Sequence, residues 1–283
     1  IINRGAAEAI EATTNTAFRF RAMTELLRLL TKEFRPSAIP ADLGTKRDRL
    51  IRRITGNSDP CKRRRRISNE KALKVLPYAR ELVEQGYTLQ DRFKRACMCA
   101  IVGNAIEFDI LGHNFAFNGL RKRFRDAGKD LVLDDIGKIY ELVKEARTVL
   151  YLTDNAGEIV FDTLLVEQLK NTGVTVIASV KGGPIINDAI LEDAETSGMI
   201  KIADQIITTG TDAVGLPLKE VSPDFLDVYN TVDIVFAKGM GYAETLTEYK
   251  LKKPHALLFR VKCNPVANFF GVGRETNVAK LMR

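Results

Sequence analysis

The sequence predicts an α/β fold, in which a mostly parallel sheet flanked by helices follows a first half made of helices alone. Two observations support this. In the first half, apolar residues recur at spacings of three and four, as they do on the buried face of a helix. From Arg147 onward, short β-branched runs alternate with helical stretches. This alternation is typical of parallel strands that are connected by helices lying on both faces of a sheet.

The first half is expected to hold several helices separated by short breaks. Pro36 and Pro40 favour a loop over Lys32–Asp42. Ser68 can cap a helix, and Pro77 predicts a kink in that helix or its division into two shorter ones. The helices are expected at Ala6–Leu30, Leu43–Ile54, Ser68–Gln85, Leu89–Ile106 and Leu133–Ala146.

The second half is expected to hold the sheet. The predicted strands are Val149–Leu152, Val174–Val180, Gln205–Thr208, Val232–Phe236 and Ala256–Val261, and the predicted helices are Glu158–Asn171, Ile185–Ser197 and Glu244–Lys250. A boundary near Lys144–Arg147 divides the chain into a helical domain, 1–145, and an α/β domain, 146–283. Because no low-complexity linker marks this boundary, the two parts are expected to pack as one body.

The composition is that of a soluble globular protein, with 45% hydrophobic and 28% charged residues among 283. No apolar run approaches the ~20 residues that span a bilayer, so no membrane partner is expected. The chain starts at Ile1, which leaves open whether native residues precede it, and no signal peptide is visible. Four cysteines, read as reduced thiols, favour a cytoplasmic location. With only two histidines, any metal is expected to be bound mainly by oxygen.

The densest positive charge is the run Lys62–Arg66. The whole chain carries a net charge of +7 and has a pI of about 9.2, which suits an anionic ligand or a nucleic acid. The run is interpreted first as a solvated helix start or loop beside the active crevice. A non-catalytic nucleic-acid binder is an alternative, although interleaved aromatic residues and a known binding motif are both lacking. Nucleic acid is therefore not favoured as a partner.

Three predicted strands end in residues that suit a metal and a phosphate. The strand that begins near Tyr151 runs into Asp154-Asn155-Ala156-Gly157-Glu158, the next runs into Lys181-Gly182-Gly183-Pro184, and a later one runs into Lys238-Gly239-Met240-Gly241. In an open α/β sheet the carboxyl ends of the strands form the ligand crevice. The three segments are therefore expected to build one site.

Each residue type at these ends has a chemical reason. Asp154, Asn155 and Asp188 offer oxygen ligands to a hard cation, although each aspartate alone is explained as simply by helix capping. Lys181 and Lys238 can neutralise phosphate oxygens, and Gly182, Gly183 and Gly239 allow the backbone to approach a ligand. Neither the Walker order nor the dinucleotide fingerprint is present. At the end of the most apolar helix, Asn104 and Asp109 are further candidates, and ordinary surface polarity explains them equally well.

Together these segments resemble the metal-dependent damage-control phosphatase family, long catalogued as domain of unknown function 89. The matching segments are Gly103–Asp109, Asp154–Asp162, Lys181–Asp188, Lys238–Thr245 and Lys262–Ala267. The resemblance implies a Rossmann-like α/β domain joined to an N-terminal multi-helical domain. It also implies a divalent metal (Mg, Mn, Ni or Co) held by Asp154, Asn155 and Asp188. The Cys-x-x-Cys pair with which some archaeal and bacterial members begin is absent here.

The expected activity is hydrolysis of phosphate monoesters of small metabolites, including damaged sugar phosphates or phosphopantetheine-type compounds. A metal-bound water, with Glu158 as base or water-orienting group, is one mechanism, and Asp154 as a covalent nucleophile is the other. A SAM-dependent carboxyl methyltransferase is the alternative enzyme, for which Asp154–Gly157 is a poor substitute for a glycine-rich loop. The sequence leaves the natural substrate, the metal and the oligomeric state open.

Overall fold

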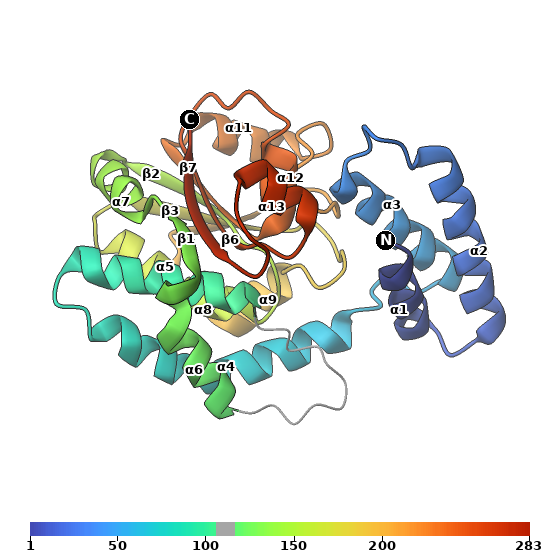
Figure 1. Ribbon diagram of the computed structural model, residues 1–283, viewed down its shortest axis with the longest axis horizontal. Coiled ribbons are helices and arrows are strands. Elements are labelled where there is room, and N and C mark those ends of the chain that lie inside the picture. The colour runs from blue at the N-terminus through green and yellow to red at the C-terminus, as the bar shows by residue number, and fades with distance from the viewer. Residues whose placement is uncertain (106–116) are drawn as a thin grey trace.

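A computed structural model describes residues 1–105 and 117–283 of the protein, with the side chains of residues 104, 105 and 117–120 also left undescribed. The described residues form a twisted seven-stranded sheet with helices on both faces (Figure 1). Three helices, α1–α3, gather at one side, and α4 leads from them along one face of the sheet. The α/β class predicted from the sequence is confirmed.

The sheet has the strand order β1-β7-β6-β5-β2-β3-β4. Neighbours from β6 to β4 are parallel, β7 is antiparallel to β6, and β1 is parallel to β7. The strands are β1 (Leu131–Asp134), β2 (Thr148–Leu152), β3 (Thr175–Val180), β4 (Gln205–Thr208), β5 (Ile234–Lys238), β6 (His255–Arg260) and β7 (Asn277–Met282).

The helices described here lie around this sheet and at its side. They are α1 (Ile2–Ala12), α2 (Thr16–Glu33), α3 (Pro40–Thr55), α4 (Lys62–Glu84), α5 (Leu89–Ala105), α6 (Phe117–Asp126), α7 (Ile136–Glu145), α8 (Glu158–Lys170), α9 (Leu191–Ser197), α10 (Met199–Ile202), α11 (Pro223–Thr231), α12 (Met240–Leu246) and α13 (Asn264–Phe270), with a 3₁₀ turn at Ala127–Asp130. In the described part of the chain, no helix is long and apolar enough to cross a membrane.

The central strands are apolar on both sides because each side faces a separate core. In β2, Val149 and Tyr151 enter the core beneath α4, α5, α7 and α8, whereas Leu150 and Leu152 enter the core beneath α11, α12 and α13. Successive side chains of a strand point to opposite faces, so a strand covered by helices on both sides needs a continuous apolar run. This is why the central strands could be found from the sequence.

The first expected helix, Ala6–Leu30, is wrong as a single element. The chain breaks after α1 at Thr13, whose backbone is extended, and α2 restarts with Asn15 as its cap. The Asn15 side chain accepts hydrogen bonds from the backbone N–H groups of Ala17 (2.9 Å) and Phe18 (3.3 Å). An Asn cap satisfies donors that the helix itself cannot satisfy, so the break is stabilised locally.

The helix expected at Ser68–Gln85 is longer and is not divided. It starts at Lys62 and continues through Pro77 to Glu84. Proline removes one backbone hydrogen bond. Here Val75 on one side of the proline and Ala79 on the other are both buried in the same core, and this packing holds both parts of the helix against it.

The stretch expected as a helix at Leu133–Ala146 begins as a strand. Residues 131–134 form β1 beside β7, and α7 starts only at Ile136. Asp135 fixes the junction, since its N–H donates to Ala279 O (2.9 Å) and its carboxylate accepts from Leu281 N (3.1 Å). The sheet therefore takes a strand from before the proposed division into 1–145 and 146–283.

Candidate active site

The carboxyl ends of β2, β3 and β5 lie side by side, because β2 is the strand between the other two. The chain passes from β2 to β3 on one side and returns later to β5 on the other, which makes the β2–β5 boundary a topological switch point. Ligands of open α/β sheets bind at such a point. Asp154 follows β2, Lys181 follows β3 and Gly239 follows β5, so the three segments singled out by sequence meet at one edge.

Hydrogen bonds tie the loop after β2 to the loop after β3. Asn155 and Asp188 form an isolated antiparallel bridge, Ala189 N donates to Asp154 O (2.7 Å) and Ala156 N donates to Asn187 O (2.9 Å). The Asn155 side-chain nitrogen also donates to Asp154 Oδ2 (2.6 Å). The three proposed metal ligands thus occupy two adjacent, mutually bonded loops, and their side chains belong to one cluster.

The surroundings of the two aspartates disfavour their ionised forms. Burial raises the pKa of Asp188 to about 6, with the Lys181 charge opposing the shift. The pKa of Asp154 is raised well above its usual value, first by withdrawal from water and then by the charges of Glu158 and Asp188, even though part of its surface stays exposed. Like charges crowded in a dry site favour a bound cation.

The donor chemistry fits a hard divalent metal. Two carboxylates and one amide offer oxygen atoms, the ligands that Mg²⁺ and Mn²⁺ prefer. In the part of the chain that the structure describes, no group of three His, Cys, Asp or Glu side chains converges as a metal site. The structure thus brings these three residues together, and their role as ligands stays a prediction.

At Gly239 the site has no room for a side chain. Its backbone has φ +83° and ψ 166°, a conformation that essentially only glycine adopts. A Cβ at this position would lie 1.9 Å from Asp154 Oδ2 and 2.2 Å from its Cγ. The glycine is needed because the Asp154 carboxylate occupies the space where a side chain would begin.

Lys181 lies in the cluster but is not exposed to solvent. The side chain is 1% exposed, and its ammonium lies 3.6 Å from Asp188 Oδ2, donates to Gly215 O (2.6 Å) and sits 4.6 Å from the centre of the Tyr242 ring. Burial lowers the pKa of Lys181, and the charges of Asp188 and Asp154 oppose that change. Lys181 is therefore placed beside a proposed ligand, and contact with a phosphate stays a prediction.

The two glycines after Lys181 have different surroundings. A Cβ on Gly182 would lie 2.6 Å from the backbone of Gly210 and Thr211, so the neighbouring loop requires this glycine. A Cβ on Gly183 would make only an ordinary contact, 3.5 Å from Asp212 Cβ. Close approach of a ligand, the reason expected from sequence, is thus unnecessary to explain Gly182.

Lys238 lies deeper than a phosphate-binding residue is expected to lie. It is fully buried, and its ammonium donates to Glu158 Oε1 (2.6 Å), Asp162 Oδ1 (2.8 Å) and Ala100 O (3.0 Å). Burial by itself would lower the pKa of Lys238, but the charges of those two carboxylates raise it above its usual value. An ammonium has three donors, and all three are used inside the protein. The expected direct contact with phosphate disagrees with this geometry, which instead makes Lys238 the support of Glu158.

Two sequence candidates, Asn104 and Asp109, lie at and beyond the end of the described part of α5. Asn104 belongs to the last turn of α5, and its side chain lies outside the described residues, as does the whole of Asp109. Gly103, one residue earlier, packs against α8, where a Cβ would lie 3.4 Å from Glu158 Cγ. The end of α5 therefore borders the site.

Sequence reasoning missed Asn69, which supports the turn after β2. This residue is buried in α4, and its side-chain oxygen accepts from Gly157 N (2.6 Å) while its nitrogen donates to Asp193 (2.7 Å). The sequence did contain a hint of this role. Asn69 lies three residues before Ala72 and so falls on the apolar stripe of the helix, where a polar side chain needs a partner.

Lys262 is a second residue near the site. It follows β6, and its charge lowers the pKa of Asp154, against the larger effect of burial. The signal was again a lysine after a strand, the fourth strand end in the row. A cation close to the proposed ligands adds to the positive field that an anionic substrate would meet.

The basic run Lys62–Arg66 forms the first turns of α4, and Arg65 is its buried member. Arg65 is 2% exposed, and so the expectation of a solvated run is wrong for this residue. The pairs are Lys62–Glu192, Arg64–Glu11, Arg65–Asp59, Arg65–Asp193 and Arg66–Glu70. Arg64 and Arg65 thus stabilise contacts with α1, α9 and the loop before α4, whereas Lys62, Arg63 and Arg66 are exposed, as expected for a solvated helix start.

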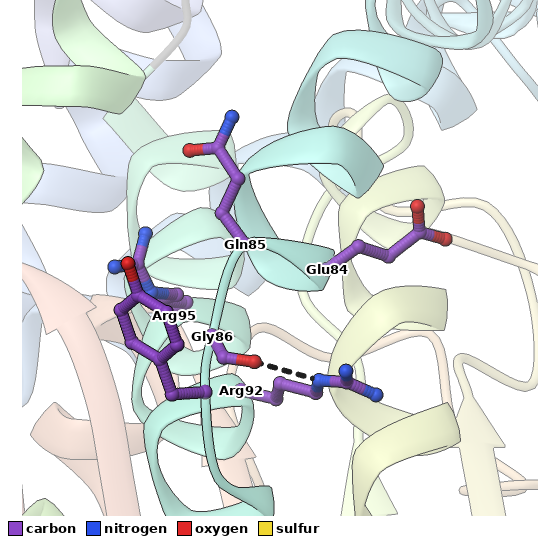
Figure 2. A pocket seen from close by; sticks show the side chains of 6 residues that line it. Glu84, Gln85, Gly86, Arg92 and Arg95 are labelled. Atoms are coloured by element: carbon purple, nitrogen blue, oxygen red, sulfur yellow. Dashed lines mark hydrogen bonds between the residues drawn. The ribbon is translucent and has the colours of Figure 1, made fainter.

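A cavity of about 610 Å³ lies at the turn between α4 and α5 (Figure 2). Arg92 there donates from Nε to Gly86 O (3.0 Å). This turn is at the opposite end of α5 from Gly103, which contacts Glu158. The cavity is therefore separate from the aspartate cluster.

Comparison with known proteins places the chain in a family. A family model described as the damage-control phosphatase ARMT1-like domain matches residues 1–278. A damage-control phosphatase from Archaeoglobus fulgidus is 37% identical over 93% of this chain and 89% of its own, and one from Pyrococcus horikoshii is 37% identical over 95% and 88%. An uncharacterised protein from Methanocaldococcus jannaschii is 36% identical over 98% and 91%. The crystal structure of a DUF89 family protein from Pyrococcus horikoshii superimposes with a TM-score of 0.87 at 35% identity, covering 98% of this chain and 94% of that one.

Proposed function

The chain belongs to the damage-control phosphatase family with the ARMT1-like domain, and we propose that it is a divalent-metal-dependent phosphatase. Its proposed substrates are phosphate monoesters of small metabolites, among them damaged sugar phosphates and phosphopantetheine-type compounds. One observation carries the proposal. Asp154, Asn155 and Asp188 form a cluster in which burial and the crowding of negative charge raise the pKa of both aspartates, beside Lys181 and Lys262.

The metal is proposed to be held by oxygen atoms of Asp154, Asn155 and Asp188, with Mg²⁺, Mn²⁺, Ni²⁺ or Co²⁺ as the candidates. When bound, such an ion polarises a phosphoryl group and lowers the pKa of a coordinated water. Lys181 and Lys262 would add positive charge toward the phosphoryl oxygens. Positioning and charge stabilisation supply most of the rate in phosphoryl transfer, and these residues are arranged for both.

Two mechanisms remain distinct for this site. In the first, a water attacks the phosphorus, the ester P–O bond breaks, and the alcohol leaves with a proton taken from the attacking water; the chain only orients the reactants. In the second, the Asp154 carboxylate attacks the phosphorus from the end of β2, the ester P–O bond breaks and the alcohol leaves with a proton from solvent. Water then hydrolyses the aspartyl phosphate, which releases phosphate and regenerates the carboxylate. Trapping a phosphorylated Asp154 would select the second. Glu158, the base suggested by sequence, accepts a hydrogen bond from the Lys238 ammonium at 2.6 Å, so one of its two oxygens is already engaged within the protein.

The test is phosphate release from a panel of phosphate esters with Mg²⁺, Mn²⁺, Co²⁺ or Ni²⁺. We expect activity that requires metal and that falls at least about 100-fold in Asp188→Asn, because one anionic ligand is lost. Asp126→Asn is the matched control, since Asp126 pairs only locally with Lys129 at the end of α6. Metal-independent activity, or full activity in Asp188→Asn, would contradict the proposal. A cytoplasmic location and a small-molecule partner remain predictions.

A further inference from the structure

A buried polar network lies directly behind the proposed metal ligands. Lys238 at the end of β5 bonds to Glu158 and Asp162, which are one turn apart on α8, and to Ala100 O on α5. The Tyr151 hydroxyl on β2 donates to the same oxygen of Asp162 (2.9 Å). Lys238, Glu158 and Asp162 are each no more than 1% exposed. Two strands and two helices are thus joined around one ammonium.

Glu158 connects this network to the site. Glu158 Oε1 accepts from Lys238 at 2.6 Å, and its other oxygen, Oε2, accepts from the Asn155 side-chain nitrogen at 3.2 Å. The same nitrogen donates to Asp154 Oδ2 at 2.6 Å. Both contacts are made by the nitrogen end of the amide, which donates while the two carboxyl oxygens accept. The amide oxygen is then turned away from both.

We propose that Lys238 and Glu158 are positioning residues that fix the Asn155 amide so that its oxygen, rather than its nitrogen, faces a bound cation. This inference rests on the proposed function, since it assigns a role to residues behind the same metal site. An amide that flips by 180° presents N–H donors, which cannot ligate a cation. Residues that orient metal ligands typically contribute about 10–100-fold to metal affinity when they are mutated.

Lys238 is the part of the arrangement that holds the Glu158 side chain in place. Its ammonium donates to Glu158 Oε1, whereas Asn155 donates to Oε2, so the two contacts use different oxygens of the carboxyl group. The ammonium is itself fixed by Asp162 Oδ1 and Ala100 O. Lys238 therefore anchors the oxygen that accepts from the Asn155 amide.

The test exchanges donor and acceptor between positions 155 and 158. In Glu158→Gln the new amide can pair with Asn155 in either orientation, and we expect Mn²⁺ to bind about 10–100-fold more weakly. In Asn155→Asp a carboxylate faces Glu158 without a donor between them, and binding should also weaken, although a ligand gains charge. In the double variant the introduced amide donates to the introduced carboxylate and accepts from Lys238, so affinity should recover at least about tenfold from Glu158→Gln.

The readout is the Mn²⁺ dissociation constant from calorimetry, with no substrate present, beside the metal-free unfolding midpoint of each variant. Glu167→Gln is the matched control on the same helix, because Glu167 pairs with Arg80 (2.6 Å) near the surface. The decisive result is a change of sign: Asn155→Asp weakens binding in the wild-type background and strengthens it in the Glu158→Gln background. The Asn155→Asp half requires no change in the buried network, so it can be measured even if Glu158→Gln unfolds.

Two results would overturn the inference. One is wild-type affinity in Glu158→Gln, and the other is tighter binding in Asn155→Asp with Glu158 intact. Neither result touches the proposed phosphatase activity, which is measured separately by phosphate release. If the wild-type protein binds none of the four metals, the proposed function fails first and this inference fails with it.

Discussion

Replacing Gly239 by alanine places a methyl group where the Asp154 carboxylate now lies. The new Cβ would be 1.9 Å from Oδ2, whereas ordinary contact begins near 3.4 Å, so the carboxylate has to retreat by about 1.5 Å. Misplacement of a reacting group by about 1 Å costs about 100-fold in rate. We expect Gly239→Ala to lose metal-dependent phosphate release by at least that factor and to bind Mn²⁺ more weakly.

The same substitution also strains the backbone, and a control separates the two effects. The Gly239 conformation costs a residue with a side chain about 1–3 kcal/mol, and the clash adds about 1–3 kcal/mol more. Gly271 also has a positive φ, +66°, but a Cβ there meets no atom within 4 Å. Gly271→Ala should therefore lose about 1–2 kcal/mol of unfolding free energy and keep its activity.

Urea unfolding, Mn²⁺ calorimetry and phosphate release, measured on both variants, decide the question. A folded Gly239→Ala protein with wild-type metal affinity and activity would refute the reasoning, because Asp154 would then tolerate the displacement. Equal loss of activity in Gly271→Ala would show that backbone strain in general, rather than the position of Asp154, controls the site.

Two further predictions concern buried ionisable groups. Burial raises the pKa of Glu244 from 4.5 to about 7, so the folded state disfavours its ionised form and stability is lost as the pH rises through that range. Glu244→Gln should be more stable than wild type by about 1–3 kcal/mol at pH 8 in urea unfolding, and this advantage should shrink toward pH 5; an equal effect at both pH values would contradict it. The thiols of Cys61, Cys97 and Cys99 are buried, and burial raises the pKa of each, whereas Cys263 is partly exposed. One thiol should therefore react rapidly with a thiol reagent in the native protein, and a fast phase that survives Cys263→Ser would show this to be wrong.

The central strands and their carboxyl ends could be predicted because burial on both faces leaves an unbroken apolar run. The sequences of β1 and β7 contain no such unbroken apolar run. Leu131–Asp134 is only four residues long and has one side facing solvent, and β7 contains Lys280 and is defined by the strands that pair with it. An edge strand of this kind takes its structure from distant partners, which a local pattern does not contain.

The sequence predicted those residues of the candidate site that come directly after a strand. Asp154 and Lys181 were identified in this way, and the structure brings them together. The depth of Lys238 could not be predicted, because a lysine after a strand is usually exposed and its two partners lie 80 and 76 positions away. One signal was available, since Glu158 and Asp162 are one turn apart in the first half of a helix where, apart from Thr163, their neighbours up to Val166 are all apolar.

The position of β7 in the sheet determines the order in which the strands can pair during folding. Among the described strands, β1 joins the sheet only through β7, which is made nearly 150 residues later. During synthesis the segment at 131–134 therefore has to wait, unpaired, while the five parallel strands that follow it can already associate. Completion of that edge is a late event, and a ribosome-bound intermediate should expose the 131–135 segment to proteases until residues 277–282 have emerged.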